Sequence, residues 1–339
     1  MGSIKIIKNM IEALVEDWPG RVGYYKNGFP ISGPSDPYAH RVGNILVGND
    51  PTNALIEVSG GMFAAEFNDD AIISVTGGDL SPQIDGIAIP MWRAITIKKS
   101  QVLSLKSDKG LGFKSYIAIS GGIHVPKFLG SSSTCIYGNY GGFEGRSLKV
   151  DDVLIFGESG NLSDRILDFK LPEKHLREYS NNMEVKIMLG PSSYPEYIND
   201  YAIDTLSKMK FKVSRNSNRS GSRLESDPSV FPKGWARKDG GEAGIHPSNI
   251  VDMGYTVPGG LNIAGDQIIV LGPDGPCGGG YVIIGSVIRS SLSNMFQLTP
   301  GKGQVRFKIV EQNDVENLRI SYEREIQKIG SLISEGDFN

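Results

Sequence analysis

The chain has 339 residues, a length that favours two domains over one. Its formal net charge at pH 7 is -3, so it lacks the basic field that holds a nucleic acid. No apolar run is long enough to cross a bilayer, and the N-terminus has no signal-peptide pattern. We therefore expect a cytoplasmic protein that binds neither nucleic acid nor membrane. Cys135 and Cys277 are too few for a disulfide framework or a cysteine-based zinc site.

The first half of the chain reads as short strands. Apolar runs separated by Gly, Asp and Pro predict an antiparallel barrel or sandwich, and they cover residues 4–7, 11–15, 71–76, 94–97, 102–105, 116–119 and 153–156. A helix is predicted at 37–47, with Ser35 and Asp36 as capping candidates and Gly48 after its end.

The second half shows the same pattern of short strands after a polar stretch. Residues 158–183 are poor in glycine and read as an inter-domain connection. Strands are then predicted at 185–189, 268–271, 281–284 and 304–309, and a helix at 194–210. We therefore expect a mainly β protein with an N-terminal domain at 1–157, a linker at 158–183, a C-terminal domain at 184–310 and a C-terminal helix at 311–339.

The predicted C-terminal helix has one apolar stripe. Its members recur at steps of three and four residues, and they are Val315, Leu318, Tyr322, Ile326, Ile329 and Ile333. A stripe of this kind either packs on the chain's own domain or binds a partner protein, and the sequence leaves both open.

Common catalytic signatures are missing from the sequence. There is no GxxxxGK, GxSxG or HExxH motif, and none of the four histidines pairs with another at metal-ligand spacing. A metal hydrolase is therefore disfavoured. Glycine-dense loops with polar side chains remain as candidates, because glycine lets backbone N–H groups converge on a ligand; they cover residues 18–24, 28–36, 237–249 and 272–280. Any one of them alone could be a simple hairpin turn.

The segment 246–249 (HPSN) is the densest polar group among these loops. Pro247 stiffens it and biases His246 toward extended backbone, so three neighbouring polar side chains could meet one small ligand. A lone histidine in a loop is more often structural, and that reading also stays open.

Several of these segments together resemble a known family. WPGRVGY, GFPISGPSDPYAHRVGNILVGN, VTGGDL, GGF-G-R, ARKDGGEAGIHPSN and LGPDGPCGGGYV are similar to the allophanate hydrolase subunit 2 family, and within it to the carboxyltransferase region of urea carboxylase. The resemblance runs in colinear order from about residue 4 to 309. It implies two cyclophilin-like β-barrels and a biotin-dependent carboxyltransferase, which moves CO2 from carboxybiotin to the nitrogen of urea or a urea-like amide.

The resemblance also implies companions. A subunit-1-like chain would complete the transferase, a biotin carboxylase would use ATP, and a biotin carrier protein rather than this chain would hold the biotin. No metal is implied in this chain. Two other functions stay open, namely a subunit of an ATP-dependent 5-oxoprolinase and a non-catalytic regulator of the kinase-inhibitor antagonist type.

Carboxyl transfer requires donors for a developing oxyanion, a group that handles the substrate N–H, and exclusion of water. We expect the substrate amide or the biotin ureido oxygen to bind at His246, Ser248 and Asn249. Asp252 and Asp274 would orient the substrate N–H or act as base. Backbone N–H donors would come from Gly278, Gly279 and Gly280, while Ser32 and Asp36 would line the same cleft from the first barrel. Arg219 and Arg223 would hold the developing carboxylate.

Overall fold

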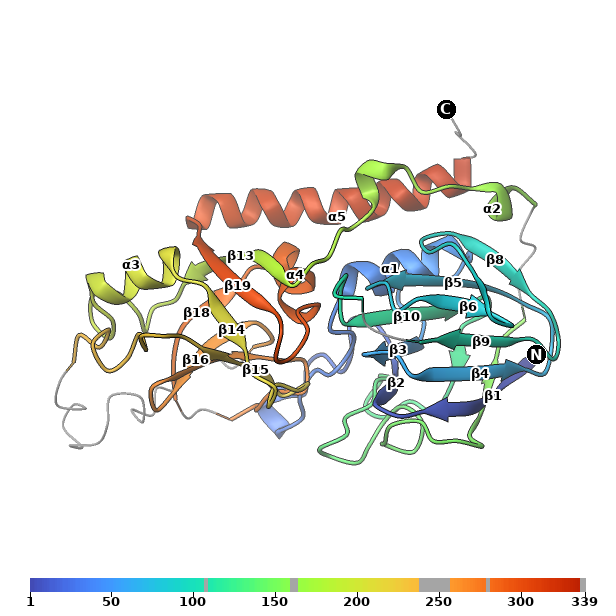
Figure 1. The fold of residues 1–339 in the computed structure, drawn as a ribbon, viewed down its shortest axis with the longest axis horizontal. Helices are drawn as coiled ribbons and strands as arrows, with labels where there is room; N and C mark the ends of the chain where they lie inside the picture. The colour runs from blue at the N-terminus through green and yellow to red at the C-terminus, as the bar shows by residue number, and fades with distance from the viewer. Residues whose placement is uncertain (107–108, 159–163, 238–256, 279–280, 336–339) are drawn as a thin grey trace. The chain divides into compact units, whose positions relative to one another are not determined.

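The computed structural model describes residues 1–106, 109–158, 164–237, 257–278 and 281–335 (Figure 1). The chain divides into two compact units. Unit 1 comprises residues 1–22, 32–179 and 322–339, and unit 2 comprises 23–31 and 180–321. The mainly β class expected from the sequence is confirmed.

Unit 1 contains a seven-stranded sheet. Its strand order is β11-β12-β1-β4-β9-β6-β7, and every pairing within it is antiparallel. The strands are β1 (Gly2–Asn9), β4 (Phe63–Phe67), β6 (Pro82–Ile84), β7 (Ile87–Ala88), β9 (Val102–Leu105), β11 (Ile123–His124) and β12 (Val153–Phe156).

A five-stranded sheet faces it across the core. Its order is β2-β3-β10-β5-β8, and its pairings are also antiparallel. The strands are β2 (Glu12–Glu16), β3 (Leu55–Ser59), β5 (Ala71–Gly77), β8 (Ala94–Ile97) and β10 (Lys114–Ile119).

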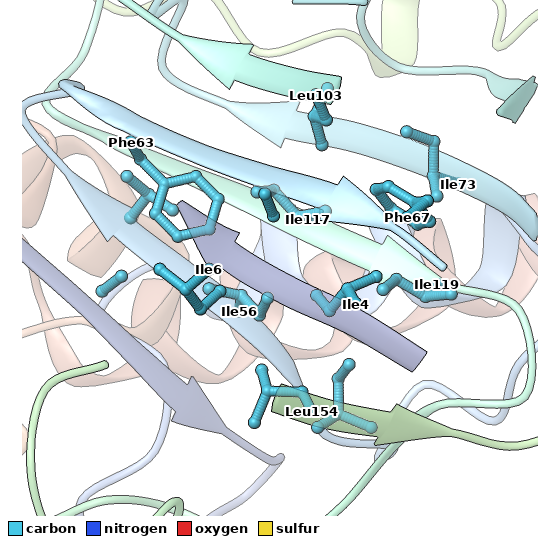
Figure 2. Close-up of a cluster of buried hydrophobic side chains, with 14 of the residues drawn as sticks. Ile4, Ile6, Ile56, Phe63, Phe67, Ile73, Leu103, Ile117, Ile119 and Leu154 are labelled. Atoms are coloured by element: carbon cyan, nitrogen blue, oxygen red, sulfur yellow. The ribbon is translucent and has the colours of Figure 1, made fainter. Parts of the chain in front are cut away.

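Alternate residues of both sheets form the core of unit 1. Ile4 and Phe67 come from the seven-stranded sheet, and Ile73 and Ile117 come from the five-stranded sheet, all almost fully buried (Figure 2). Because side chains alternate across a strand, each sheet contributes every second residue to this layer.

Helix α1 (Pro37–Leu46) covers the other face of the five-stranded sheet through β5 and β10. The Asp36 carboxylate accepts from the Ala39 amide, which is the N-cap expected from the sequence. On the sheet, Ser74 and Thr76 donate to the helix carbonyls of Gly43 and Ala39, each across 2.7 Å. The five-stranded sheet is therefore buried on both faces.

Unit 2 is a closed barrel. Its strand order is β13-β18-β16-β17-β15-β14-β19, and the barrel closes through the parallel pair β13 and β19, which lie side by side in Figure 1. The strands are β13 (Asn182–Leu189), β14 (Phe211–Val213), β15 (Gly221–Glu225), β16 (Gly260–Ala264), β17 (Gln267–Leu271), β18 (Val282–Val287) and β19 (Gln304–Ile309).

The helix predicted at 194–210 is shorter in the structure. Helix α3 runs over Asp200–Lys208, and Asn199 caps it by accepting from the Ala202 amide across 3.2 Å. Pro195 disfavours helical backbone at Tyr194, and the extended backbone of Asn199 at the cap begins the helix only after it, so the periodic residues upstream lie outside α3. Unit 2 also contains α4 (Leu292–Phe296) and the 3-10 turns η1 (Tyr25–Asn27) and η4 (Arg289–Ser291).

Helix α5 (Gln312–Glu335) confirms the predicted C-terminal helix. Its stripe is buried at Tyr322, Ile326 and Ile329, which belong to unit 1, whereas Val315 and Leu318 are half-buried. The described residues of the expected linker up to Tyr179 also belong to unit 1, and they include α2 (Asp164–Asp168) and η2 (Glu173–His175).

Candidate functional site

A cavity of about 370 Å³ lies on the outer face of the unit 2 barrel, over strands β15, β17 and β16. This size is within the range of small-ligand pockets. Its lining consists of Asn218, Ser220, Gly221, Arg223, Asn262, Ala264, Ile269, Leu271, Pro276, Gly278 and Tyr281. The strands supply the floor, and the rim consists of Asn218, Ser220, Pro276, Gly278 and Tyr281.

Strand alternation explains which residues reach this face. Leu224, Ile263 and Ile268 point into the barrel core, so their neighbours Arg223, Asn262 and Ile269 point outward. Arg223 pairs with Ile269 across β15 and β17, and Asn262 pairs with Ile269 across β16 and β17. The three residues therefore form one row, with an apolar side chain between a cationic and an amide side chain.

Glycine keeps the floor of the cavity open. A Cβ at Gly221 would lie 2.7 Å from Cγ2 of Ile269, closer than carbon atoms approach in folded proteins. A larger residue at this position would displace Ile269 or fill the space beside it. Gly221 therefore maintains the depth of the cavity.

Arg223 is the cationic side chain of the cavity. It is half-buried, and among the described residues its guanidinium has no carboxylate partner. A guanidinium presents five N–H donors in a planar fork that matches a carboxylate or another planar oxygen group. Arg223 was a candidate for this role from the sequence, and the structure places it in the cavity wall.

Asn262 also lines the cavity but was not among the residues that the sequence singled out. Its side chain is buried, and Oδ1 has no hydrogen-bond partner in the described part of the chain. One signal could have revealed it, because the segment 260–264 is otherwise made of glycine and apolar residues. A polar residue at the centre of such a strand is either on its solvent face or at a site.

Arg219 and Asp274 form a buried ion pair below the rim. Nε of Arg219 lies 2.8 Å from Oδ2 of Asp274, and the Asp274 amide donates to the Arg219 carbonyl across 3.1 Å. The Gly272 amide donates to the Ser220 carbonyl across 2.9 Å. These bonds fasten the loop after β17 to the turn before β15. Neither charged side chain lines the cavity, so the pair positions the loops that do.

The two site candidates from the first half of the chain lie inside unit 1. Ser32 is buried, has a φ of 56°, and its hydroxyl accepts from Nη1 of Arg21 across 3.3 Å. Asp36 is buried at the start of α1, where its second oxygen accepts from the Tyr179 hydroxyl across 2.6 Å. Both side chains have structural partners within the unit.

The remaining candidates divide into two groups. Gly278 lines the cavity, and a Cβ built on it would meet no described atom within 4 Å. Six candidates lie outside the described residues, namely His246, Ser248, Asn249, Asp252, Gly279 and Gly280.

A second polar cluster is buried in unit 1, between α1 and the five-stranded sheet. The Glu57 carboxylate accepts from the Tyr116 hydroxyl across 2.8 Å and from Nζ of Lys114 across 2.9 Å. Nε2 of His40 donates to the Glu16 carbonyl across 3.1 Å, and Nδ1 of His40 has no partner among the residues that the structure describes. Complete burial lowers the pKa of His40 to about 4, although the bond to Glu16 opposes the shift. His40 is therefore neutral at physiological pH.

Within the described ranges, no group of three His, Cys, Asp or Glu residues is arranged to hold a metal ion. The helices of the same ranges include none that combines the length and apolar character needed to span a bilayer.

Known proteins match this chain in sequence. Urea amidolyase of Saccharomyces cerevisiae is 38% identical over 291 residues, which are 85% of this chain and 16% of that protein. A 5-oxoprolinase component of Escherichia coli is 29% identical over 300 residues, which are 88% of this chain and 89% of that protein. The chain thus spans a small part of the first relative and most of the second.

Solved structures match it in fold. The crystal structure of the Kluyveromyces lactis urea carboxylase superposes with a TM-score of 0.85 at 31% identity, covering 96% of this chain and 29% of that one. The family described as "Carboxyltransferase domain, subdomain A and B" matches residues 27–309, well over half of the sequence. The resemblance noted in the sequence is confirmed, and the chain belongs to this carboxyltransferase domain family.

Proposed function

We propose that the chain is the carboxyltransferase component of a biotin-dependent carboxylase and transfers CO2 from carboxybiotin to a nitrogen of urea or a urea-like amide. Membership of the carboxyltransferase domain family supports the reaction class. The relatives named urea amidolyase and urea carboxylase support a urea-like substrate.

The observation that carries the proposal is the guanidinium of Arg223 in a cavity with an apolar floor. Carboxyl transfer places negative charge on the oxygens of a small planar group, and a fixed guanidinium stabilises such charge best where water is excluded. Ile269 and Leu271 form the apolar side of this cavity. The cavity therefore combines a charge-stabilising donor with a surface on which a flat ligand can lie.

These residues fit the head group of biotin. A ureido ring is flat, carries one carbonyl oxygen and has apolar faces, which matches Ile269 below and Arg223 at the edge. Carboxybiotin would supply the activated carboxyl group. Arg223 would hold the oxygen on which negative charge develops, and the Arg219–Asp274 pair would hold the rim in place around it.

The proposed reaction requires companions. A biotin carboxylase using ATP, a biotin carrier protein and a subunit-1-like chain would complete the enzyme. The matched region is 16% of urea amidolyase, which supports a role as one part of a larger enzyme.

The test is carbon fixation in a reconstituted complex. Labelled bicarbonate, ATP and urea are supplied with the biotin carboxylase, the carrier and the companion chain, and labelled carboxylated product is measured. Arg223→Gln should lower turnover about a hundredfold, the usual effect of losing one preorganised donor. Arg306→Gln is the matched control, because Arg306 is exposed on β19 and pairs only with Glu184 among the described residues. Normal turnover of Arg223→Gln would contradict the proposal.

One observation favours a second function. The 5-oxoprolinase component of Escherichia coli is 29% identical to this chain over 300 residues. Supplying 5-oxoproline in place of urea, with ATP consumption as the readout, separates the two. Activity with 5-oxoproline and none with urea would establish the second function.

A further inference from the structure

The amide of Asn262 is an unexplained polar group in the cavity wall. Its residue is 7% exposed, and Oδ1 has no hydrogen-bond partner within the described ranges. Buried side-chain oxygens nearly always have a partner, because an unsatisfied one costs the free energy of its lost hydration. The oxygen itself is almost closed off from solvent, while the residue lines the cavity, so a turn of the side-chain amide toward a donor on a ligand would satisfy it.

The position of Asn262 restricts that ligand. Asn262 and Arg223 are both direct neighbours of Ile269, on opposite sides of β17. Two strand spacings separate their Cα atoms by about 10 Å, and both side chains extend over the same face of the sheet. The space between them has Ile269 as its floor. A small flat group fits there with one edge toward the amide and the other toward the guanidinium.

We propose that Asn262 is the residue that selects the ligand of this cavity, with Oδ1 accepting an N–H of a planar amide or ureide whose oxygen faces Arg223. The inference rests on the proposed function in taking the cavity as its substrate site. Esters, carboxylates and fully N-alkylated amides have no N–H to offer, so they leave Oδ1 unsatisfied and are rejected. Both the amide to be carboxylated and the ring of biotin have this chemistry.

The unsatisfied Oδ1 of Asn262 also predicts that one substitution will raise stability and weaken ligand binding. Leucine has nearly the shape of asparagine and needs no hydrogen bond, so Asn262→Leu removes the unsatisfied oxygen from the free protein. We expect the melting temperature to rise by roughly 2–4 °C while ligand binding weakens. A residue with a purely structural role would lose stability on the same change.

The experiment measures binding of 2-imidazolidinone to the purified full chain by ligand-observed NMR. Its N,N′-dimethyl derivative has the same ring and carbonyl oxygen but no N–H. We expect the dimethyl compound to bind at least about tenfold more weakly than the parent, and Asn262→Leu to weaken the parent to the same degree. Gln267→Leu is the matched control, because Gln267 lies on the adjacent strand and does not line the cavity.

Urea and biotin are also titrated, in separate experiments, to show which of them occupies the cavity. Only the natural ligand should bind more weakly to Asn262→Leu than to the wild type. Equal binding of the parent and dimethyl compounds, unchanged binding by Asn262→Leu, or no binding to the wild type would each overturn the inference. These outcomes are independent of the carbon-fixation assay. If ligand binding depends on Asn262 but the reconstituted complex transfers no carboxyl group, only the proposed function is contradicted. If the complex transfers the carboxyl group but ligand binding does not depend on Asn262, only this inference is contradicted.

Discussion

Arg219 and Asp274 face one another across 2.8 Å, with their side chains 1% and 0% exposed, and so join two loops that are far apart in the sequence. Both charges lie away from water, so removal of the Asp274 carboxylate deprives the Arg219 guanidinium of an ion pair in a place where hydration cannot replace it. Asp274→Ala should therefore lower the free energy of unfolding by about 3–5 kcal/mol.

Differential scanning calorimetry measures this loss, and Arg219→Met combined with Asp274→Leu provides the comparison. The double variant removes both buried charges together, so it should lose much less than the sum of the single changes. A single-variant loss below about 1 kcal/mol would show that the pair contributes little to the barrel.

The buried His40 should make unit 1 sensitive to mild acid. Its pKa is lowered to about 4 in the fold, against about 6.5 in an unfolded chain. The unfolded chain therefore binds a proton that the folded one does not, so stability is complete above pH 6.5 and falls as the pH drops to about 4. The loss is on the order of 3 kcal/mol.

His40→Gln should flatten this part of the profile while keeping a donor for the Glu16 carbonyl. The measurement is the melting temperature of both proteins from pH 7 to pH 4, and the difference between the curves isolates His40 from the carboxylates. Parallel curves would show that His40 titrates at its ordinary pKa.

Two helical glycines should respond in opposite ways to alanine. A Cβ at Gly43 would lie 2.9 Å from Oγ1 of Thr76, which donates to the Ala39 carbonyl, whereas a Cβ at Gly330 would meet no described atom within 4 Å. Gly330→Ala should stabilise by up to about 1 kcal/mol through helix propensity. Gly43→Ala should destabilise by roughly 1–3 kcal/mol, because overpacking outweighs that gain. Calorimetry on the two variants shows whether each substitution raises or lowers the free energy of unfolding.

Glu325 on α5 should stabilise unit 1 far more than an ordinary helix glutamate. One oxygen lies 3.1 Å from both the Tyr38 hydroxyl and Nδ1 of His175, and the other accepts from Arg177 across 2.6 Å. Burial alone would raise the pKa of Glu325, but these bonds outweigh it and lower the pKa. Its stabilisation is therefore present at neutral pH and lost as the pH falls below the ordinary value for glutamate, about 4.3.

Glu325→Gln should reduce the free energy of unfolding by about 1.5–3 kcal/mol at pH 7. The control is Glu316→Gln, because Glu316 is exposed on the same helix and pairs only with Arg319 among the described residues, so its loss should stay below about 0.5 kcal/mol. Equal losses in the two variants, measured by calorimetry, would contradict a special role for Glu325.

Local signals in the sequence were enough for part of the fold. The Asp36 cap and the apolar periodicity predicted α1 and α5 with nearly correct ends, and short runs rich in apolar or alternating apolar residues predicted β8, β9, β12 and β19 with their observed bounds. These features depend on neighbours in the chain, where propensity and capping act.

Two of the strands that form the cavity floor, β15 and β16, were not predicted from these local signals. Strands β15 and β16 begin with glycine and contain Arg223 and Asn262, so their composition hides the apolar alternation. Those polar residues are the ones that line the cavity. The row through Ile269 could not be predicted either, because it depends on the register of β15, β17 and β16, which pairing between distant segments determines.

The parallel pair that closes the barrel has a consequence for how the protein is made. Strand β19 pairs with β13 on one side and β14 on the other, and residues 184 and 306 of the pair are 122 positions apart. During synthesis, before β19 leaves the ribosome, β13 and β14 both have an unpaired edge. High contact order of this kind slows folding, so the nascent barrel should need protection from aggregation until its last strand emerges.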